Sequence, residues 1–121
     1  MPIRYLVEDA VSFVKKEINR EKKYDGIILD PPKYGRGPNG EIWKIEENLL
    51  DLMLLIKEIL SENPLFLVIT SYAIRSSHMS LYNLLKSSLN FDYGKYSSGE
   101  LGIRESGKKR RVLSLSLIHI W

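Results

Sequence analysis

The chain has 121 residues with a formal net charge of +3, and 44% of its residues are hydrophobic. This length permits one domain, and the apolar content is enough for a folded core, which excludes wholesale disorder. The mildly basic charge permits a nucleic-acid partner without requiring one. Because the chain has no cysteine, disulfides, thiolate zinc sites and a cysteine nucleophile are excluded. No apolar run approaches the roughly 20 residues of a membrane span, and no signal-peptide pattern opens the chain, so we expect a cytoplasmic protein without membrane contact.

The first part of the chain predicts a strand, a helix and a second strand. Residues 3–7 form a short apolar run, for which we expect a strand. A helix should follow directly, with Asp9 as its N-cap. Its expected apolar face consists of Ala10, Val11, Val14 and Ile18, and its expected solvated face of Lys15, Lys16, Glu17 and Arg20. Residues 27–29 are apolar and rich in β-branched side chains, which predicts a buried strand that ends at Asp30.

The second part continues the alternation. After an expected loop over residues 35–40, the clearest helix pattern of the chain ends at Asn63-Pro64, with apolar positions at Ile45, Leu49, Leu52, Met53, Ile56, Ile59 and Leu60. A buried strand over residues 65–70 and a helix from about His78 to Leu89 follow. We then expect a loop over 99–107, with a solvated turn at 108–111, and a last strand from Val112. This alternation predicts an α/β fold with a mostly parallel sheet, an antiparallel last strand and helices on both faces.

The tripeptide Asp30-Pro31-Pro32 follows the predicted strand over 27–29. Two prolines end the pairing of that strand, because neither can donate an N–H group to a neighbour. A carboxylate at the carboxyl end of a parallel strand, beside a rigid turn, lies where open α/β sheets bind their ligands. The residues alone leave two interpretations open, a ligand site and an ordinary turn with a solvated carboxylate.

The sequence Asp-Pro-Pro-Lys-Tyr-Gly, which starts at Asp30, resembles motif IV of the class I S-adenosylmethionine (SAM)-dependent methyltransferases. The similarity is greatest to the rRNA-methyltransferase-like group that carries Asp-Pro-Pro-Lys, and it extends from Pro2 to about Leu89. It implies a Rossmann-like methyltransferase sheet, SAM as the cofactor, no metal, and methyl transfer to a nucleic-acid base, with RNA, in particular rRNA, as the expected partner. In enzymes with motif IV the methyl group is transferred by an in-line displacement. The protein assists this reaction by positioning the reactants and by stabilising the transition state electrostatically.

The resemblance also implies roles for individual residues. Asp9 and Ala10, after the first expected strand, would bind the cofactor through its adenine, and Asp30 would border both cofactor and substrate. Asp30 and the Pro31 carbonyl would orient an amine of the target base, while Pro32 limits the freedom of the turn. Tyr34 would stack on an extruded base, and the substrate-binding residues would be Lys33, Tyr34 and Arg36. For each there is a simpler alternative: Asp9 can be only a helix cap, Tyr34 a loop anchor, and the two basic residues solvated.

Two departures from the family pattern restrict the chemistry. Lys33 separates the second proline from the aromatic residue, which in Asn-Pro-Pro-Tyr enzymes follows the proline directly. Enzymes that make 5-methylcytosine need a cysteine after the next strand, where this chain has Thr70-Ser71-Tyr72. The sequence therefore disfavours attack at pyrimidine C5, and an amine and a ring nitrogen both remain as acceptors.

The resemblance implies a sheet of order 3-2-1-4-5-7-6 with a glycine-rich cofactor loop after the first strand, and this chain has no such loop. We therefore expect residues 1–121 to be a partial domain that starts at strand 3 and is inactive in isolation. Residues 115–120 are what CTGTCTCTTATACACATC encodes, the end of a transposon used to prepare sequencing libraries, so we expect the tail from about residue 114 to be non-native. The alternatives are a non-catalytic remnant or binding module, and a methyltransferase that acts on protein or a small molecule.

Overall fold

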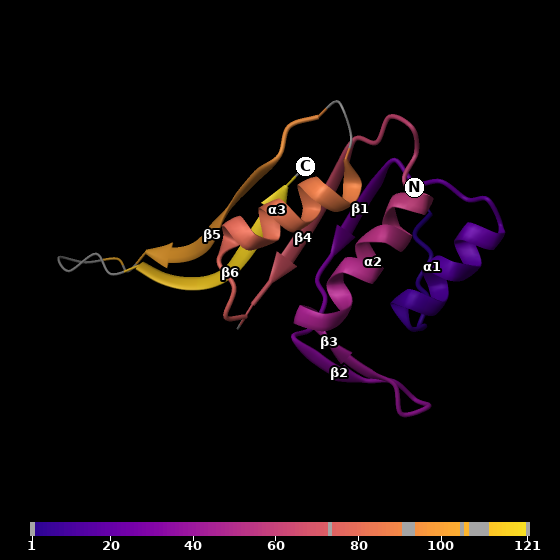
Figure 1. Cartoon of the computed structure of the whole chain (residues 1–121), viewed down its shortest axis with the longest axis horizontal. Helices are drawn as coiled ribbons and strands as arrows, with labels where there is room; N and C mark the ends of the chain where they lie inside the picture. The colour runs from indigo at the N-terminus through magenta and orange to yellow at the C-terminus, as the bar shows by residue number, and fades with distance from the viewer. Residues whose placement is uncertain (1, 73, 91–93, 105, 107–111, 121) are drawn as a thin grey trace.

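A computed structural model of the chain describes residues 2–72, 74–90, 94–104, 106 and 112–120, the last of these ranges by its backbone. Within them the order of elements is α1, β1, β2, β3, α2, β4, α3, β5 and β6. Figure 1 shows the helices beside one sheet, with the small hairpin of β2 and β3 projecting beyond the end of both. No helix in the described ranges is long and apolar enough to cross a membrane. The expected solvated turn at 108–111 lies outside the described residues.

All three predicted helices are present. Helix α1 (Ala10–Asn19) begins at Asp9, whose carboxylate accepts the Ser12 backbone N–H at 2.8 Å, as the sequence predicts. Helices α2 (Ile45–Ile59) and α3 (His78–Leu89) follow the predicted periodicity. Every apolar position predicted for α2 is buried: Ile45, Leu49, Leu52, Met53, Ile56, Ile59 and Leu60. Because α2 packs against both α1 and α3, these residues form the centre of the core.

The main sheet has the strand order β1-β4-β6-β5. Strands β1 (Gly26–Leu29) and β4 (Phe66–Ser71) are parallel, while β6 (Val112–Ile120) is antiparallel to both β4 and β5 (Ser97–Arg104). In the numbering of the methyltransferase sheet, this order corresponds to strands 4-5-7-6. The predicted α/β class is therefore confirmed, including the antiparallel strand that begins at Val112. The loop expected over 99–107 is wrong as far as residue 104, because β5 occupies that stretch.

Residues 3–7 do not form the predicted strand, since no other strand pairs with them. Their apolar side chains lie in solvent, with Ile3 73% and Tyr5 85% exposed. A strand is held by a ladder of hydrogen bonds to a neighbour. The order implied by the resemblance places strand 3 beside strand 2, and no strand in the described part of the chain takes that place.

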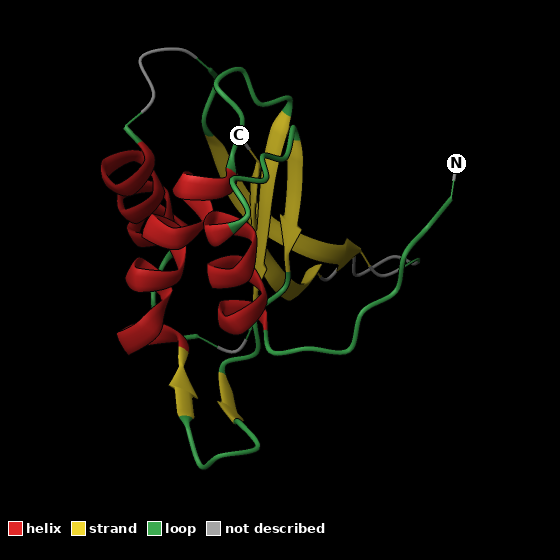
Figure 2. Ribbon diagram, turned by 90° about the vertical axis from the view of Figure 1, so that its right-hand side faces the viewer, coloured by secondary structure: helices red, strands yellow, loops and turns green. Residues whose placement is uncertain are grey.

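The three helices lie together on one face of the sheet (Figure 2). On the opposite face Ile28 is 70% exposed, so the predicted burial of residues 27–29 is wrong at this position. The expectation of helices on both faces is met on one face only, within the described residues. The Phe66 ring lies over Gly26 on the neighbouring strand, where an added Cβ atom would come within 2.4 Å of the ring. A side chain at position 26 would collide with this ring, which explains why β1 begins with a glycine.

Glu17 was expected on the solvated face of α1, but it is buried. Its carboxylate accepts hydrogen bonds from the Tyr24 hydroxyl and, at 2.8 Å, from the Arg20 guanidinium. These bonds, that from Tyr24 first and that from Arg20 second, lower the pKa of Glu17. Helical periodicity misses this contact because the hydroxyl belongs to a residue beyond the helix end.

Replacing Tyr24 by Phe should remove the main cause of that pKa shift. We expect the pKa of Glu17 to rise toward its ordinary value, which carbon-13 NMR of the carboxyl group can follow. A carboxyl group with a lowered pKa adds stability above its unfolded-state pKa and loses it as the pH falls through its folded-state pKa. The urea midpoint of Tyr24→Phe should therefore lie below that of the wild type at pH 7, and the gap should narrow below about pH 4. Tyr5→Phe is the matched control because Tyr5 is 85% exposed; an equal effect there would contradict the assignment.

Candidate functional site

Asp30 and Thr70 lie at the carboxyl ends of the two parallel strands. Leu29 and Ile69 are paired in register, so the next residue of each strand reaches the same edge of the sheet. There the Thr70 hydroxyl donates a hydrogen bond to Asp30 Oδ1. Within the described residues the other oxygen of Asp30 has no partner. The hydrogen bond from Thr70 to one oxygen thus orients the Asp30 carboxylate and leaves its other oxygen available to accept a hydrogen bond.

The prolines after Asp30 are held by the segment that follows them. Pro31 is buried and Pro32 is exposed. The Trp43 indole N–H donates to the Pro32 carbonyl at 2.7 Å, and the Ile45 backbone N–H donates to the Lys33 carbonyl at 3.0 Å. These bonds attach the turn to β3 and to the first residue of α2.

The loop predicted over residues 35–40 is part of a β-hairpin, in which residues 35 and 36 belong to the first strand and residues 37–40 form the turn. Strands β2 (Tyr34–Arg36) and β3 (Ile42–Lys44) are antiparallel, and the Gly37 N–H donates to the Glu41 carbonyl at 2.8 Å. Gly40 has a φ of 86°, a left-handed conformation that favours glycine in a tight turn. The Glu41 carboxylate is held by the backbone N–H groups of Glu41 and Asn39, which lower its pKa. The sequence signal for this hairpin is the Pro38-Asn39-Gly40 turn, which is followed by the strand-favouring residues Ile42 and Trp43.

The outward face of the hairpin carries one aromatic and two cationic side chains. Tyr34 is opposite Lys44, and Arg36 is opposite Ile42, so the four side chains share a face. Tyr34 is 49% exposed, and its hydroxyl accepts a hydrogen bond from Arg36 Nε at 3.0 Å. Lys44 is bound to Glu47 at 2.8 Å, which raises the pKa of the lysine. The structure thus brings the predicted residues Tyr34 and Arg36 together, while the predicted Lys33 is half-buried at the base of the hairpin.

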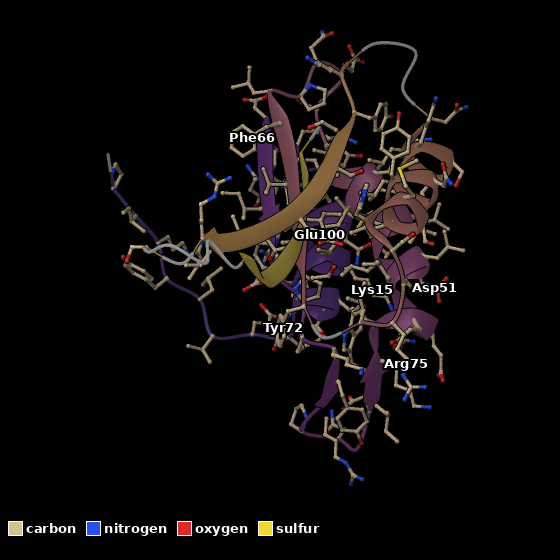
Figure 3. All side chains as sticks on the ribbon, turned by 90° about the vertical axis from the view of Figure 1, so that its left-hand side faces the viewer. Lys15, Asp51, Phe66, Tyr72, Arg75 and Glu100 are labelled. Carbon is tan, nitrogen blue, oxygen red and sulfur yellow. The ribbon has the colours of Figure 1, made fainter. Side chains whose placement is uncertain are left out.

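Asp9 and Ala10 lie at the start of α1. In Figure 1 this helix begins at the end of the molecule from which the hairpin projects. One Asp9 oxygen caps the helix, and the other has no partner within the described residues. Figure 3 shows Tyr72, just after β4, at this same end, and Phe66 at the opposite end of β4. Candidates for cofactor and acceptor binding therefore share one end of the fold.

A cavity of about 330 Å³ lies between the N-terminal segment, α1 and Tyr24, and neither Asp30 nor the hairpin lines it. Arg4, Lys16 and Arg20 line it together with Glu8 and Glu17, so its charges are largely compensated. Among the described residues there is no group of three or more metal-ligating side chains. The sheet edge at Asp30 is thus the candidate site.

No family model matches the chain, and no curated protein matches it. Among solved structures, the SAM-dependent methyltransferase from Agrobacterium tumefaciens is 43% identical over 99% of this chain, with a TM-score of 0.90. The chain is a relative of the SAM-dependent methyltransferases. It spans 40% of the length of the Agrobacterium protein.

Two further structures share the fold at lower identity. A protein from Streptococcus mutans assigned as a SAM-dependent methyltransferase is 18% identical over 94% of this chain and 29% of its own, with a TM-score of 0.62. M1.HpyAVI, solved as a complex with SAM, is 17% identical over 93% of this chain and 52% of its own, with a TM-score of 0.56. At these identities the likeness shows the Rossmann-like fold alone, and the roles of individual residues remain predictions.

Proposed function

We propose that this chain supplies the acceptor side of a methyl-transfer site, in which an amine of a nucleic-acid base, in rRNA, receives the methyl group of SAM. The observation that carries this proposal is the Asp30 carboxylate at the end of β1, fixed by Thr70 on one oxygen and open on the other. The 43% identity to a SAM-dependent methyltransferase supports the reaction class. With an rRNA substrate we also propose a cytoplasmic location.

The acceptor nitrogen must direct its lone pair at the methyl carbon. Two fixed acceptors for its hydrogens, the open oxygen of Asp30 and the Pro31 carbonyl, would orient it so. SAM would supply the methyl group, and its sulfur would keep the electron pair of the bond that is broken. The methylated nitrogen would then lose one proton, and Asp30 would accept it because its carboxylate would already bind that hydrogen. The Tyr34 ring would support the extruded base, with Arg36 and Lys33 toward the phosphates.

The cofactor would meet this chain at Asp9. Its free carboxylate oxygen can accept a hydrogen bond from an adenine amino group, and Ala10 presents only a methyl group to the approaching ring. When bound, SAM supplies an electrophilic methyl group. The residues of this chain fit one side of the cofactor. We therefore assign Asp9 and Ala10 to its adenine, and Asp30 to the place where cofactor and substrate meet.

The test is a methylation assay with the protein as its gene encodes it, including every segment that accompanies this chain. The protein is incubated with SAM labelled in its methyl group and, separately, with ribosomal RNA from cells that lack the gene, genomic DNA, protein extract and a metabolite extract. We expect label in rRNA, in a nucleoside whose mass spectrum shows an N-methyl group. Label found only in protein or only in metabolites would mean that the substrate is a protein or a small molecule and not a nucleic acid. No label in any pool, together with no calorimetric SAM binding, would favour a non-catalytic module.

A further inference from the structure

A tryptophan from β3 holds the carbonyl that ends the Asp-Pro-Pro turn. The Trp43 indole N–H donates to the Pro32 carbonyl at 2.7 Å. Trp43 is paired with Gly35 in the hairpin, and its ring is half-buried against the core. The indole therefore connects the turn to the packed interior.

This side-chain bond matters because the turn has few other means of support. Proline has no N–H group, so neither Pro31 nor Pro32 can be fixed by donating to a neighbouring carbonyl. Apart from the packing of the buried Pro31 ring, the turn can be held only by hydrogen bonds to its carbonyl groups and to Asp30. An indole is a donor without an acceptor on a rigid ring, and it fixes the direction of the carbonyl to which it donates.

The hydrogen bonds around the turn also decide which acceptors stay available. The Pro32 carbonyl is bound by Trp43, the Lys33 carbonyl by Ile45, and Asp30 Oδ1 by Thr70. Within the described residues no donor reaches the Pro31 carbonyl or the second oxygen of Asp30. The two groups left open are adjacent in sequence.

We propose that Trp43 is a positioning residue, which fixes the Pro32–Lys33 peptide and thereby the turn that precedes it, so that the Pro31 carbonyl and the open oxygen of Asp30 face one acceptor amine. This inference rests on the proposed function for its catalytic consequence, but its structural part stands separately. The hairpin of β2 and β3 would then fix the geometry of the acceptor site through Trp43, in addition to any contact that its outward face makes with the substrate.

The test compares Trp43→Phe with Leu54→Ala in the protein as its gene encodes it. Phenylalanine keeps an aromatic ring without the N–H group, whereas Leu54 is 46% exposed in the middle of α2, outside the hairpin and the proposed site. We expect kcat to fall about tenfold to a hundredfold in Trp43→Phe, with the KM for SAM unchanged, and both constants to stay at wild-type values in Leu54→Ala. A second variant with benzothienylalanine at position 43 keeps the bicyclic shape and lacks the N–H group. It should show the same loss of kcat, and wild-type kcat there would overturn the inference.

A measurement without turnover separates this inference from the proposed function. In protein labelled with carbon-13 at its proline carbonyls, the Pro31 and Pro32 signals should shift or broaden in Trp43→Phe and in the benzothienylalanine variant, and should not change in Leu54→Ala. Unchanged proline signals would overturn the positioning role, even in a protein that methylates rRNA. Shifted signals in a protein that methylates nothing would support the positioning role and reject the proposed function.

Discussion

Asp30→Ala is expected to reduce methylation of rRNA about a hundredfold or more in the protein as its gene encodes it, with SAM binding nearly unchanged. The substitution removes the carboxylate that Thr70 orients at the end of β1 and leaves the prolines in place. Positioning and electrostatics supply most of the catalysis in an in-line methyl transfer, so the loss of one fixed acceptor should appear in kcat. Radiolabel incorporation gives the rate, and calorimetric titration gives the affinity for SAM.

Asp30→Asn should fall between the wild type and Asp30→Ala. The amide retains one oxygen acceptor. If the Thr70 hydroxyl rotates, its oxygen can accept a hydrogen bond from the amide nitrogen, and the amide oxygen can then still face the substrate amine. The matched control is Asp25→Ala, because Asp25 is an exposed aspartate just before β1, at the opposite end of the same strand. Equal losses in Asp25→Ala and Asp30→Ala would mean that the effect arises from the strand and not from the site. Wild-type activity in Asp30→Ala would refute the role of Asp30.

The helices were predictable from sequence because each of them contacts the core along one face. The seven apolar positions of α2 recur at helical spacing, and each of them is buried. The same logic located β1, β4 and the last strand. This reasoning failed where the structure of a segment, or the burial of a residue, depends on a contact with another part of the chain. Residues 3–7 have a strand-like composition but no neighbour to pair with, and Glu17 is buried because of a tyrosine seven residues further along the chain.

The candidate site was predictable in part. The end of a strand, a carboxylate and two prolines located Asp30, and the N-cap pattern located Asp9. Sequence reasoning missed the role of Thr70, because the register of β1 and β4 brings together two residues forty positions apart. It also missed the bond from Trp43 to the Pro32 carbonyl, since the sequence pattern does not predict that residues 34–36 pair with residues 42–44 in a hairpin. Both contacts depend on strand pairing, which a single sequence specifies only weakly.

The second large effect concerns the core on which this site is built. Leu52 and Leu54 both lie inside α2, but Leu52 is 4% exposed and Leu54 is 46% exposed. Replacing either leucine by alanine changes helix propensity equally, so the difference between the two variants isolates burial. We expect Leu52→Ala to lower the free energy of unfolding by about 2–5 kcal/mol, and Leu54→Ala by less than about 1 kcal/mol.

Urea unfolding followed by circular dichroism measures both values, provided that the transitions have equal slopes. The comparison also bears on the site, because α2 begins at Ile45, whose N–H binds the Lys33 carbonyl beside the Asp-Pro-Pro turn. A destabilised α2 should therefore loosen the turn as well as the core. If Leu52→Ala reduces stability but leaves the proline carbonyl signals of the folded protein unchanged, the turn is held by Trp43 and Thr70 independently of the helix. If those signals shift as they do in Trp43→Phe, the core and the acceptor site form one cooperative unit.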